Sequence, residues 1–223
     1  MATSSPIKMD TRTMVSPFAP AIGAWSISKG KRVFDLVLAS IGFLLSIPLM
    51  GIIAILVKCS SAGSLLFRQE RAGRFGTPFE LLKFRTMANA SGPLLTRKGD
   101  PRVTRIGRML RRTKLDELPQ LLNVIRGDMS LVGPRPDLPQ YWETLKPVCP
   151  RIFELQPGLT STASLCFRDE ESLLATVPAD SLSEYYTSRL LPTKAKMDLQ
   201  YAETATLLSD IKVLFATVLG SNY

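Results

Sequence analysis

The chain has 223 residues, enough for one domain with a membrane segment, and 28 lysines and arginines against 19 acidic residues give it a net charge of +9. This basic balance favours anionic partners such as phosphates, nucleotides and acidic lipid headgroups. A hydrophobic fraction of 45% is too low for a multi-span transporter. The sequence contains no histidine, which excludes Ser-His and Cys-His nucleophile pairs and imidazole metal sites.

The three cysteines, Cys59, Cys149 and Cys166, lie far apart and form no CxxC motif. Their spacing argues against a zinc site or a disulfide framework. We expect all three to be small buried residues in a reducing cytoplasm.

The N-terminal part of the chain predicts a tail followed by a membrane segment. Residues 1–30 are rich in Ser, Thr, Pro and Ala with little periodicity, which predicts a flexible tail. A cleaved signal peptide is not expected, because the apolar segment starts too late and is too long. Residues 36–57 carry no charge and match the roughly 20 residues that cross a bilayer.

A proline near the middle of this apolar segment determines how we expect it to fold. Pro48 removes a backbone hydrogen bond and clashes with the preceding turn. Both flanks are basic, so the positive-inside rule gives neither end a preferred side. A helix–break–helix hairpin that enters and leaves on the cytoplasmic face satisfies both facts. Pro48 would form the break, and Ser46 can bond a carbonyl three or four residues back. The alternative is a kinked single-span helix.

The remaining sequence predicts an α/β domain that is mainly helical, with short strands and amphipathic surface helices. Two strands are expected within residues 64–87, around turn signals at 73–78, and a polar loop at 89–100. Gly127 should end the helix expected at 115–125. Residues 161–167 alternate only weakly. The helices are expected at 102–110, 115–125, 137–145, 170–174, 184–191 and 194–219. The domains are then a tail (1–30), a membrane hairpin (31–60) and a cytoplasmic catalytic domain (61–223).

Two adjacent carboxylates, Asp116 and Glu117, follow a run of arginines and precede a rigid Gly-Pro-Arg-Pro turn at 133–136. Carboxylates avoid phosphates, so an acidic pair among arginines suggests a divalent metal between acid and phosphate. We expect the pair near a helix start, with Thr113 or Asp116 as N-cap, where the helix dipole keeps both ionised. An ionised aspartate is a competent nucleophile toward phosphorus when a metal and cations neutralise the phosphate oxygens. The simpler interpretation is that the acids only stabilise a helix.

Four basic side chains are candidates for binding phosphate. Arg135 stands between two prolines, which restrict the backbone and preorganise its guanidinium for two-pronged phosphate binding. Lys83 and Arg85 share one face of an expected strand and could line the same site, with a solvated strand face as the alternative. Arg112 belongs to a helical stripe, for which a solvated face weighs equally with contact to phosphate or anionic lipid headgroups. The other members of that stripe are Arg105 and Arg108.

Six sequence blocks lie in order between residue 31 and the C-terminus. They are KRVFD (31–35), FRQERAG (67–73), KFRTM (83–87), LDELPQ (115–120), GDMSLVGPRP (127–136) and PGLT (157–160). In this order they resemble the bacterial sugar transferases, the monotopic polyprenyl-phosphate glycosyl-1-phosphate transferases. Six ordered blocks are a far more specific signal than any one of them.

The resemblance implies an activity and roles for the acidic pair. Asp116 would attack the β-phosphate of a UDP-sugar and hold the sugar phosphate covalently, and Glu117, together with Asp116, would hold Mg²⁺. The acceptor would be a polyprenyl phosphate, undecaprenyl phosphate by expectation, and UMP would leave. The family also implies a re-entrant membrane hairpin. The sequence departs from the family at Gln156, where many members have an arginine, and at 161–162, which bears on substrate identity.

We therefore expect a Mg-dependent phosphoglycosyl transferase in the bacterial inner membrane, with its catalytic domain on the cytoplasmic face. It would start the assembly of an exopolysaccharide, capsule, O-antigen or other glycoconjugate. Expected partners are a UDP-sugar, polyprenyl phosphate and membrane lipids, with no nucleic acid; a homodimer is left open. One rival is a basic, membrane-attached adaptor, which does not explain carboxylates amid arginines. The other is a catalytically inactive family member, against which the intact acidic pair and the 133–136 turn argue.

Overall fold

The computed structural model describes residues 21–88, 92 and 95–220, and helices dominate it. The α-helices are α1 (Lys29–Ser60), α2 (Arg105–Thr113), α3 (Gln120–Arg126), α4 (Pro139–Leu145), α5 (Thr162–Cys166), α6 (Glu170–Ala175), α7 (Leu182–Tyr185), α8 (Leu191–Thr204) and α9 (Leu207–Leu219). The strands are β1 (Leu66–Ala72), β2 (Pro78–Phe84), β3 (Ser130–Val132) and β4 (Gly158–Thr160). Single 3-10 turns occupy Trp25–Ile27, Arg74–Gly76, Leu115–Glu117, Pro150–Glu154 and Ala179–Ser181, and Tyr186–Leu190 forms a π-helical turn. The mainly helical α/β prediction is confirmed.

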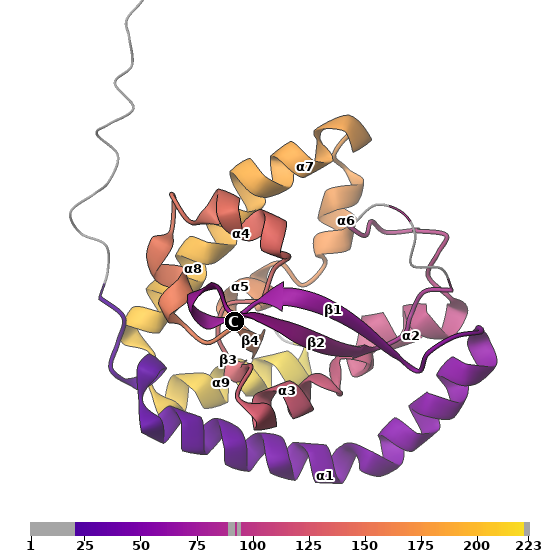
Figure 1. The fold of residues 1–223 in the computed structure, drawn as a ribbon, viewed down its shortest axis with the longest axis horizontal. Helices are drawn as coiled ribbons and strands as arrows, with labels where there is room; N and C mark the ends of the chain where they lie inside the picture. Colours follow the sequence, from indigo (N-terminus) through magenta and orange to yellow (C-terminus); the bar gives the residue numbers. More distant parts are fainter. Residues whose placement is uncertain (1–20, 89–91, 93–94, 221–223) are drawn as a thin grey trace, which may run out of the picture.

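The longest element, α1, is one bowed helix that runs along one side of the molecule (Figure 1). Ser28 caps its start by accepting a hydrogen bond from the Lys31 N–H at 2.9 Å. The helix is 32 residues long and is not interrupted at Pro48, so the expected break into two helices is absent. Neighbouring turns keep their hydrogen bonds, and a proline then bends a long helix rather than ending it. As expected, Ser46 donates its hydroxyl to the Phe43 carbonyl, at 2.9 Å.

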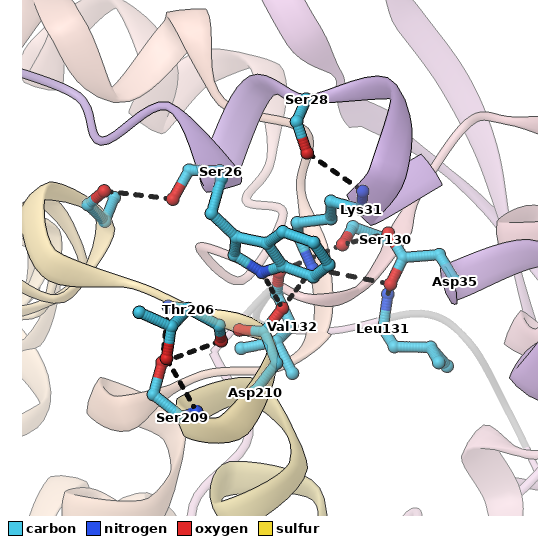
Figure 2. Close-up of polar contacts among 12 residues, drawn as sticks. Ser26, Ser28, Lys31, Asp35, Ser130, Leu131, Val132, Thr206, Ser209 and Asp210 are labelled. Atoms are coloured by element: carbon cyan, nitrogen blue, oxygen red, sulfur yellow. Dashed lines mark hydrogen bonds and ion pairs between the residues drawn. The ribbon is translucent and has the colours of Figure 1, made fainter. Parts of the chain in front are cut away.

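The N-terminal end of α1 is fastened to the domain by buried charges (Figure 2). The Lys31 ammonium lies 2.8 Å from Asp210 of α9 and 3.4 Å from Asp35, one turn further along α1. Asp35 in turn accepts hydrogen bonds from the Ser130 hydroxyl at 2.7 Å and the Leu131 N–H at 3.2 Å. All the charged groups of this network therefore have partners, as buried charges must.

The C-terminal end of α1 packs on the same domain through apolar contacts. Ile53 and Val57 are buried in a cluster with Phe84 of β2 and Leu110 of α2. Between the two ends one face of the helix packs on the domain, where Ala39 and Phe43 contact the cluster that holds Leu121, and the opposite face leaves its apolar side chains exposed. The helix is long and apolar enough to cross a membrane. The exposed side chains are Leu36, Val37, Leu38, Ile41, Leu44, Leu45, Ile47, Leu49, Ile52 and Ile55.

The predicted hairpin at 64–87 is confirmed as an antiparallel pair, β1 with β2, in which Leu66 lies opposite Phe84. A second, parallel pair joins β3 to β4 and was not expected, because three-residue strands are too short to show a period. Close backbone approach beside this pair requires glycine. A Cβ on Gly133 would lie 2.4 Å from the Gln156 carbonyl oxygen, and one on Gly158 would lie 2.2 Å from the Gly133 nitrogen.

Several expected helices differ in their boundaries. The single helix expected at 194–219 is two, because Thr206 and Ser209 form a capping box that starts α9. The weakly alternating 161–167 segment is helical, with Ser161 as the N-cap of α5. The helix expected at 184–191 begins as α7 and continues through the π-helical turn.

Two further expectations concern the tail and the cysteines. Residues 1–20 of the expected tail, and 89–91 and 93–94 of the expected polar loop, lie outside the described residues. The rest of the tail is ordered against the domain, for the Gly23 N–H donates to the Ala202 carbonyl at 2.9 Å.

All three cysteines are free thiols, but only Cys149 is buried, so the expectation of burial is wrong for the other two.

Candidate active site

The two carboxylates lie in the 3-10 turn Leu115–Glu117, which joins α2 to α3. Asp116 and Glu117 are both buried, with 6% and 8% of their surface exposed. The chain reverses at Lys114, whose φ of 57° lies in the left-handed region. Both expected N-caps are wrong: Thr113 donates its hydroxyl to carbonyls of α2, and residue 119 holds the N-cap position of α3.

Glu117 is the centre of an ion-pair cluster. One of its oxygens, Oε1, lies 2.5 Å from Arg135 Nη2 and 3.0 Å from Lys83 Nζ, and its other oxygen lies 3.4 Å from Arg135 Nη1. Burial alone would raise the pKa of Glu117, but Arg135 and Lys83 together outweigh burial and hold it well below its usual value. The structure thus brings Glu117, Lys83 and Arg135 together around an ionised carboxylate.

Asp116 has a different environment from its neighbour. Its Oδ1 atom is buried and has no hydrogen-bond partner among the described residues. Burial raises the pKa of Asp116, and the nearby Lys83 opposes the rise. Asp116 lies in a single 3-10 turn, which supplies little dipole, so burial and the nearby cations set its pKa rather than the helix dipole that we expected. Neighbouring carboxylates whose pKa values move in opposite directions are a feature of catalytic sites.

The sequence analysis missed Arg111, which approaches the pair from α2. Its Nε donates to the Thr86 hydroxyl at 2.9 Å, and its Nη1 lies 2.8 Å from Glu171 Oε1 of α6. Its positive charge also works to lower the pKa of Asp116. The sequence alone contained no signal for this side chain, because the packing of Gly107, one turn earlier, on the Thr86 backbone decides which side of α2 faces the site.

Arg71 is a second basic residue that was not predicted as a site residue. Its Nη1 lies 3.5 Å from Asp137, which also accepts a 2.6 Å hydrogen bond from the buried Tyr186 hydroxyl. Burial lowers the pKa of Arg71, Asp137 opposes this, and the positive charge of Arg135 adds to it. Arg71 therefore stands next to Arg135. The available signal was its place in the FRQERAG block.

Two predicted phosphate-binding residues are not brought to this cluster. Arg85 follows the end of β2 and contacts the segment after α1 rather than the acidic pair. It donates to the Ser61 carbonyl at 2.6 Å and to the Ser64 carbonyl, beyond the end of α1. Arg112 is exposed on α2, one position past Arg111.

The departure at Gln156 has a structural explanation. Its side-chain amide donates to the Gly127 carbonyl at 2.6 Å and the Asp128 carbonyl at 2.7 Å. Gln156 thereby holds the turn that follows α3, and it satisfies two carbonyls near the C-terminus of that helix.

The acidic pair fits one kind of metal site. Within the described parts of the chain, no three His, Cys, Asp or Glu residues gather closely enough to hold a metal ion alone. Mg²⁺, however, is commonly bound through one or two carboxylates together with substrate phosphates. The unpartnered Oδ1 of Asp116 and the Oε2 of Glu117, whose one contact is long, are the oxygens suited to such a shared site.

A buried acidic pair contacted by basic side chains, together with a long apolar helix, is the combination expected of a membrane-associated enzyme that acts on phosphates. The sequence profile described as "Bacterial sugar transferase" matches residues 26–221, and the chain belongs to that family. The resemblance seen in the six blocks is therefore confirmed.

Three relatives illustrate what the chain is similar to. It is 35% identical to the exopolysaccharide production protein ExoY of Rhizobium meliloti, over 95% of this chain and 96% of ExoY. It is 40% identical to the UDP-glucose:undecaprenyl-phosphate glucose-1-phosphate transferase of Caulobacter vibrioides, over 84% of this chain and 68% of that protein. The enzyme of the same name from Escherichia coli is 38% identical, but the match spans 39% of its length.

Proposed function

We propose that this protein transfers a sugar-1-phosphate from a UDP-sugar to a polyprenyl phosphate, undecaprenyl phosphate by analogy with its relatives, and releases UMP. The names of the relatives support this donor and acceptor, and ExoY supports a role in exopolysaccharide production. The observation that carries the chemistry is the buried, unpartnered Oδ1 of Asp116 beside an ion-paired Glu117.

The transfer would take place in two displacements at phosphorus. A carboxylate oxygen of Asp116 attacks the β-phosphorus, the bond from that phosphorus to the bridging oxygen breaks, and UMP leaves with the electron pair. An oxygen of the polyprenyl phosphate then attacks the same phosphorus and displaces the Asp116 carboxylate. The first step converts the carboxylate into a phosphosugar ester and the second step returns it, and neither step needs a proton transfer, which is consistent with a chain that lacks histidine.

The basic side chains around the pair would orient the phosphates. Arg135 and Lys83 both contact Glu117, so they carry one positive charge more than that carboxylate neutralises, and this charge can balance Asp116 or a phosphate group. The guanidinium of Arg135 already makes two hydrogen bonds to one carboxylate, the geometry with which arginine also binds phosphate.

We also propose Mg²⁺ as the cofactor. Asp116 and Glu117 would hold the ion together with phosphate oxygens, and the ion would neutralise charge on those oxygens. This assignment rests on the donor set, since two carboxylates with available oxygens match the preference of Mg²⁺ for shared sites.

The membrane placement that we propose is monotopic. Both ends of α1 pack on one domain, through Lys31 at the start and Val57 near the end, while the middle exposes a row of apolar side chains. A helix that crossed the bilayer would put its two ends on opposite sides of a hydrocarbon layer about 30 Å thick, where one domain could not contact both. We therefore place the bow of α1 in the inner membrane and the domain on the cytoplasmic face. A homodimer stays a prediction.

The first experiment measures UMP release from a panel of UDP-sugars with undecaprenyl phosphate and Mg²⁺. Wild type is compared with Asp116→Asn and with Asp180→Asn, a matched change at an exposed aspartate. We expect Asp116→Asn to lose at least about 10³-fold in rate, because a nucleophile is removed, and Asp180→Asn to retain activity.

Intact-mass spectrometry of wild type, incubated with the UDP-sugar alone, should show an adduct of one sugar phosphate that Asp116→Asn lacks. Release of UMP by both Asp116→Asn and wild type would contradict the covalent step and leave the transferase. No release by folded wild type in membranes, with any UDP-sugar, would favour the inactive family member or the adaptor.

A further inference from the structure

One face of α2 is an uncovered row of positive charge. Arg105, Arg108 and Arg112 are all exposed, and Met109 among them has 46% of its surface exposed. Successive residues of an α-helix are turned by about 100°, so these four positions fall within one continuous face. We call this set of four residues the α2 basic face.

The orientation of the α2 basic face follows from the opposite side of the helix. Ile106 and Leu110 pack against the buried residues of α1, in the cluster that holds Ile53 and Val57. Gly107 packs on the Thr86 backbone. In rotational order around α2, Met109 comes next to the side that contacts α1, and the three arginines follow it. The face therefore changes from apolar near α1 to cationic away from it.

The charge on this face is not balanced locally. Among the described residues none of its three arginines forms an ion pair, in contrast to Arg111 on the same helix, which pairs with Glu171. Lys114, at the C-cap of α2, is a further exposed cation next to this face along the chain. Lys58 is another, in the last turn of α1, the helix end that packs on α2. Like charges held together without counterions are unfavourable, and an anionic surface removes that cost.

The position of this face beside α1 indicates what supplies the anions. The C-terminal half of α1 runs beside α2 (Figure 1) and exposes Ile52 and Ile55, so the basic face continues an apolar surface. Apolar side chains that grade into arginines match the boundary between acyl chains and headgroups.

We propose that the α2 basic face binds the headgroups of anionic phospholipids at the membrane surface. Met109 enters the headgroup boundary next to α1, and Arg105, Arg108 and Arg112 contact lipid phosphates. Of the roles that the sequence left open for Arg112, a solvated face or contact with phosphate or lipid headgroups, the proposal selects lipid contact. The inference rests on the membrane placement proposed for α1 and is independent of the transfer chemistry.

The test is flotation of the full chain with lipid vesicles after dilution from detergent, which requires no turnover. Vesicles consist of phosphatidylcholine alone or of phosphatidylcholine with phosphatidylglycerol. We expect wild type to partition more strongly into the anionic vesicles, and added salt to weaken that preference. In Arg105→Gln/Arg108→Gln/Arg112→Gln the partitioning into anionic vesicles should fall about 100-fold, at roughly 1 kcal/mol for each basic residue at a charged membrane.

Two matched variants make the result specific. Lys146→Gln/Arg189→Gln/Lys196→Gln removes the same charge from three exposed positions outside α1 and α2 and should keep the preference for anionic vesicles. The triple arginine-to-lysine variant of the α2 basic face keeps the charge and should keep it too, which separates charge from loss of fold. Equal losses in both glutamine variants would overturn the proposal. So would equal flotation of wild type with both vesicles, or a raised KM for the UDP-sugar without any change in flotation.

Discussion

At the scale of single residues, the pKa values of two adjacent carboxylates shift in opposite directions. Glu117 is contacted by Arg135 and Lys83, whereas Asp116, one residue earlier, is buried without a partner for Oδ1. The pKa of Glu117 is lowered and the pKa of Asp116 is raised. A desolvated carboxylate is a stronger nucleophile than a solvated one, and an ion-paired neighbour keeps phosphate-binding cations in place before substrate arrives.

Another buried carboxylate, Asp198 of α8, predicts how stability depends on pH. It accepts hydrogen bonds from the Ala163 N–H at 3.0 Å and the Thr162 hydroxyl at 3.2 Å, yet burial raises its pKa from 3.8 to about 6. Between these values the folded state holds a proton that the unfolded state has lost. The free energy of unfolding should therefore fall as pH rises from about 4 to 6, by about 3 kcal/mol in total.

Asp198→Asn keeps the accepting oxygen and cannot ionise, so this part of the pH dependence should disappear from thermal or denaturant unfolding followed at several pH values. Asp180→Asn, at an exposed site, serves as the control. An unchanged pH profile in Asp198→Asn would show that the carboxyl is already ionised at low pH.

Much of the site was predictable at this scale because its residues stand in distinctive local contexts. Adjacent acids identified Asp116 and Glu117, and flanking prolines identified Arg135. The errors concern direction rather than residue type. Arg112 was chosen where Arg111 points inward, and a stripe in the sequence does not tell which side of a helix is covered. Only the packing of α2 on the Thr86 backbone decides between them.

At the scale of elements, a glycine contact fixes α2 against the end of the hairpin. A Cβ at Gly107 would lie 2.0 Å from the Thr86 carbonyl oxygen, so the two backbones approach as closely as they can. The same helix carries Arg111, whose Nε donates to the Thr86 hydroxyl. The depth at which α2 packs therefore sets the reach of Arg111 toward the acidic pair.

Gly107→Ala should separate α2 from Thr86. We expect a loss of stability of about 1–3 kcal/mol, because overpacking against backbone outweighs the better helix propensity of alanine. The thermal unfolding midpoint in detergent and UMP release should both fall. Gly51→Ala in α1 is the matched control, since nothing lies within 4 Å of its added Cβ. A Gly107→Ala midpoint at or above that of wild type would contradict this account of the contact.

Element types were predicted better than element boundaries. The hairpin and α2, α4 and α6 followed from period and turn signals. The break between α8 and α9 depends on Thr206 and Ser209, a short capping signal inside a strongly apolar helical pattern. The pairing of β3 with β4 joins residues far apart in sequence and is held by close backbone contact at glycines, which no local pattern records.

At the scale of the whole molecule, α1 acts as a strap closed at both ends. Lys31 pairs with Asp210 near its start, and Val57 is completely buried near its finish. The middle carries apolar side chains with little cover, such as Leu45 with 77% of its surface exposed. Both ends of α1 are therefore attached to one domain, and the exposed apolar side chains between them form one surface.

This arrangement predicts that both ends of α1 face the same side of the membrane. A membrane-impermeant maleimide is applied to right-side-out and inverted inner-membrane vesicles that carry Cys166→Ser protein. The exposed Cys59, or Lys29→Cys in a further Cys59→Ser background, should react in inverted vesicles only. Leu45→Cys, at the apolar middle and in the same Cys59→Ser background, should react in neither. Reaction of the two ends in opposite kinds of vesicle would establish a crossing helix.

The ion pair of Lys31 with Asp210 has a consequence for biosynthesis. These residues are 179 positions apart, and Trp25 reaches the same carboxylate, at 2.8 Å, across 185 positions. On the ribosome, α1 emerges long before Asp210 exists, with its apolar side chains uncovered and with Asp35 as the one partner of Lys31 that is already present. Early capture of α1 by lipid would protect the nascent chain from aggregation. The ion pair between Lys31 and Asp210 would then form among the last events of folding, because it needs α9 to have been translated.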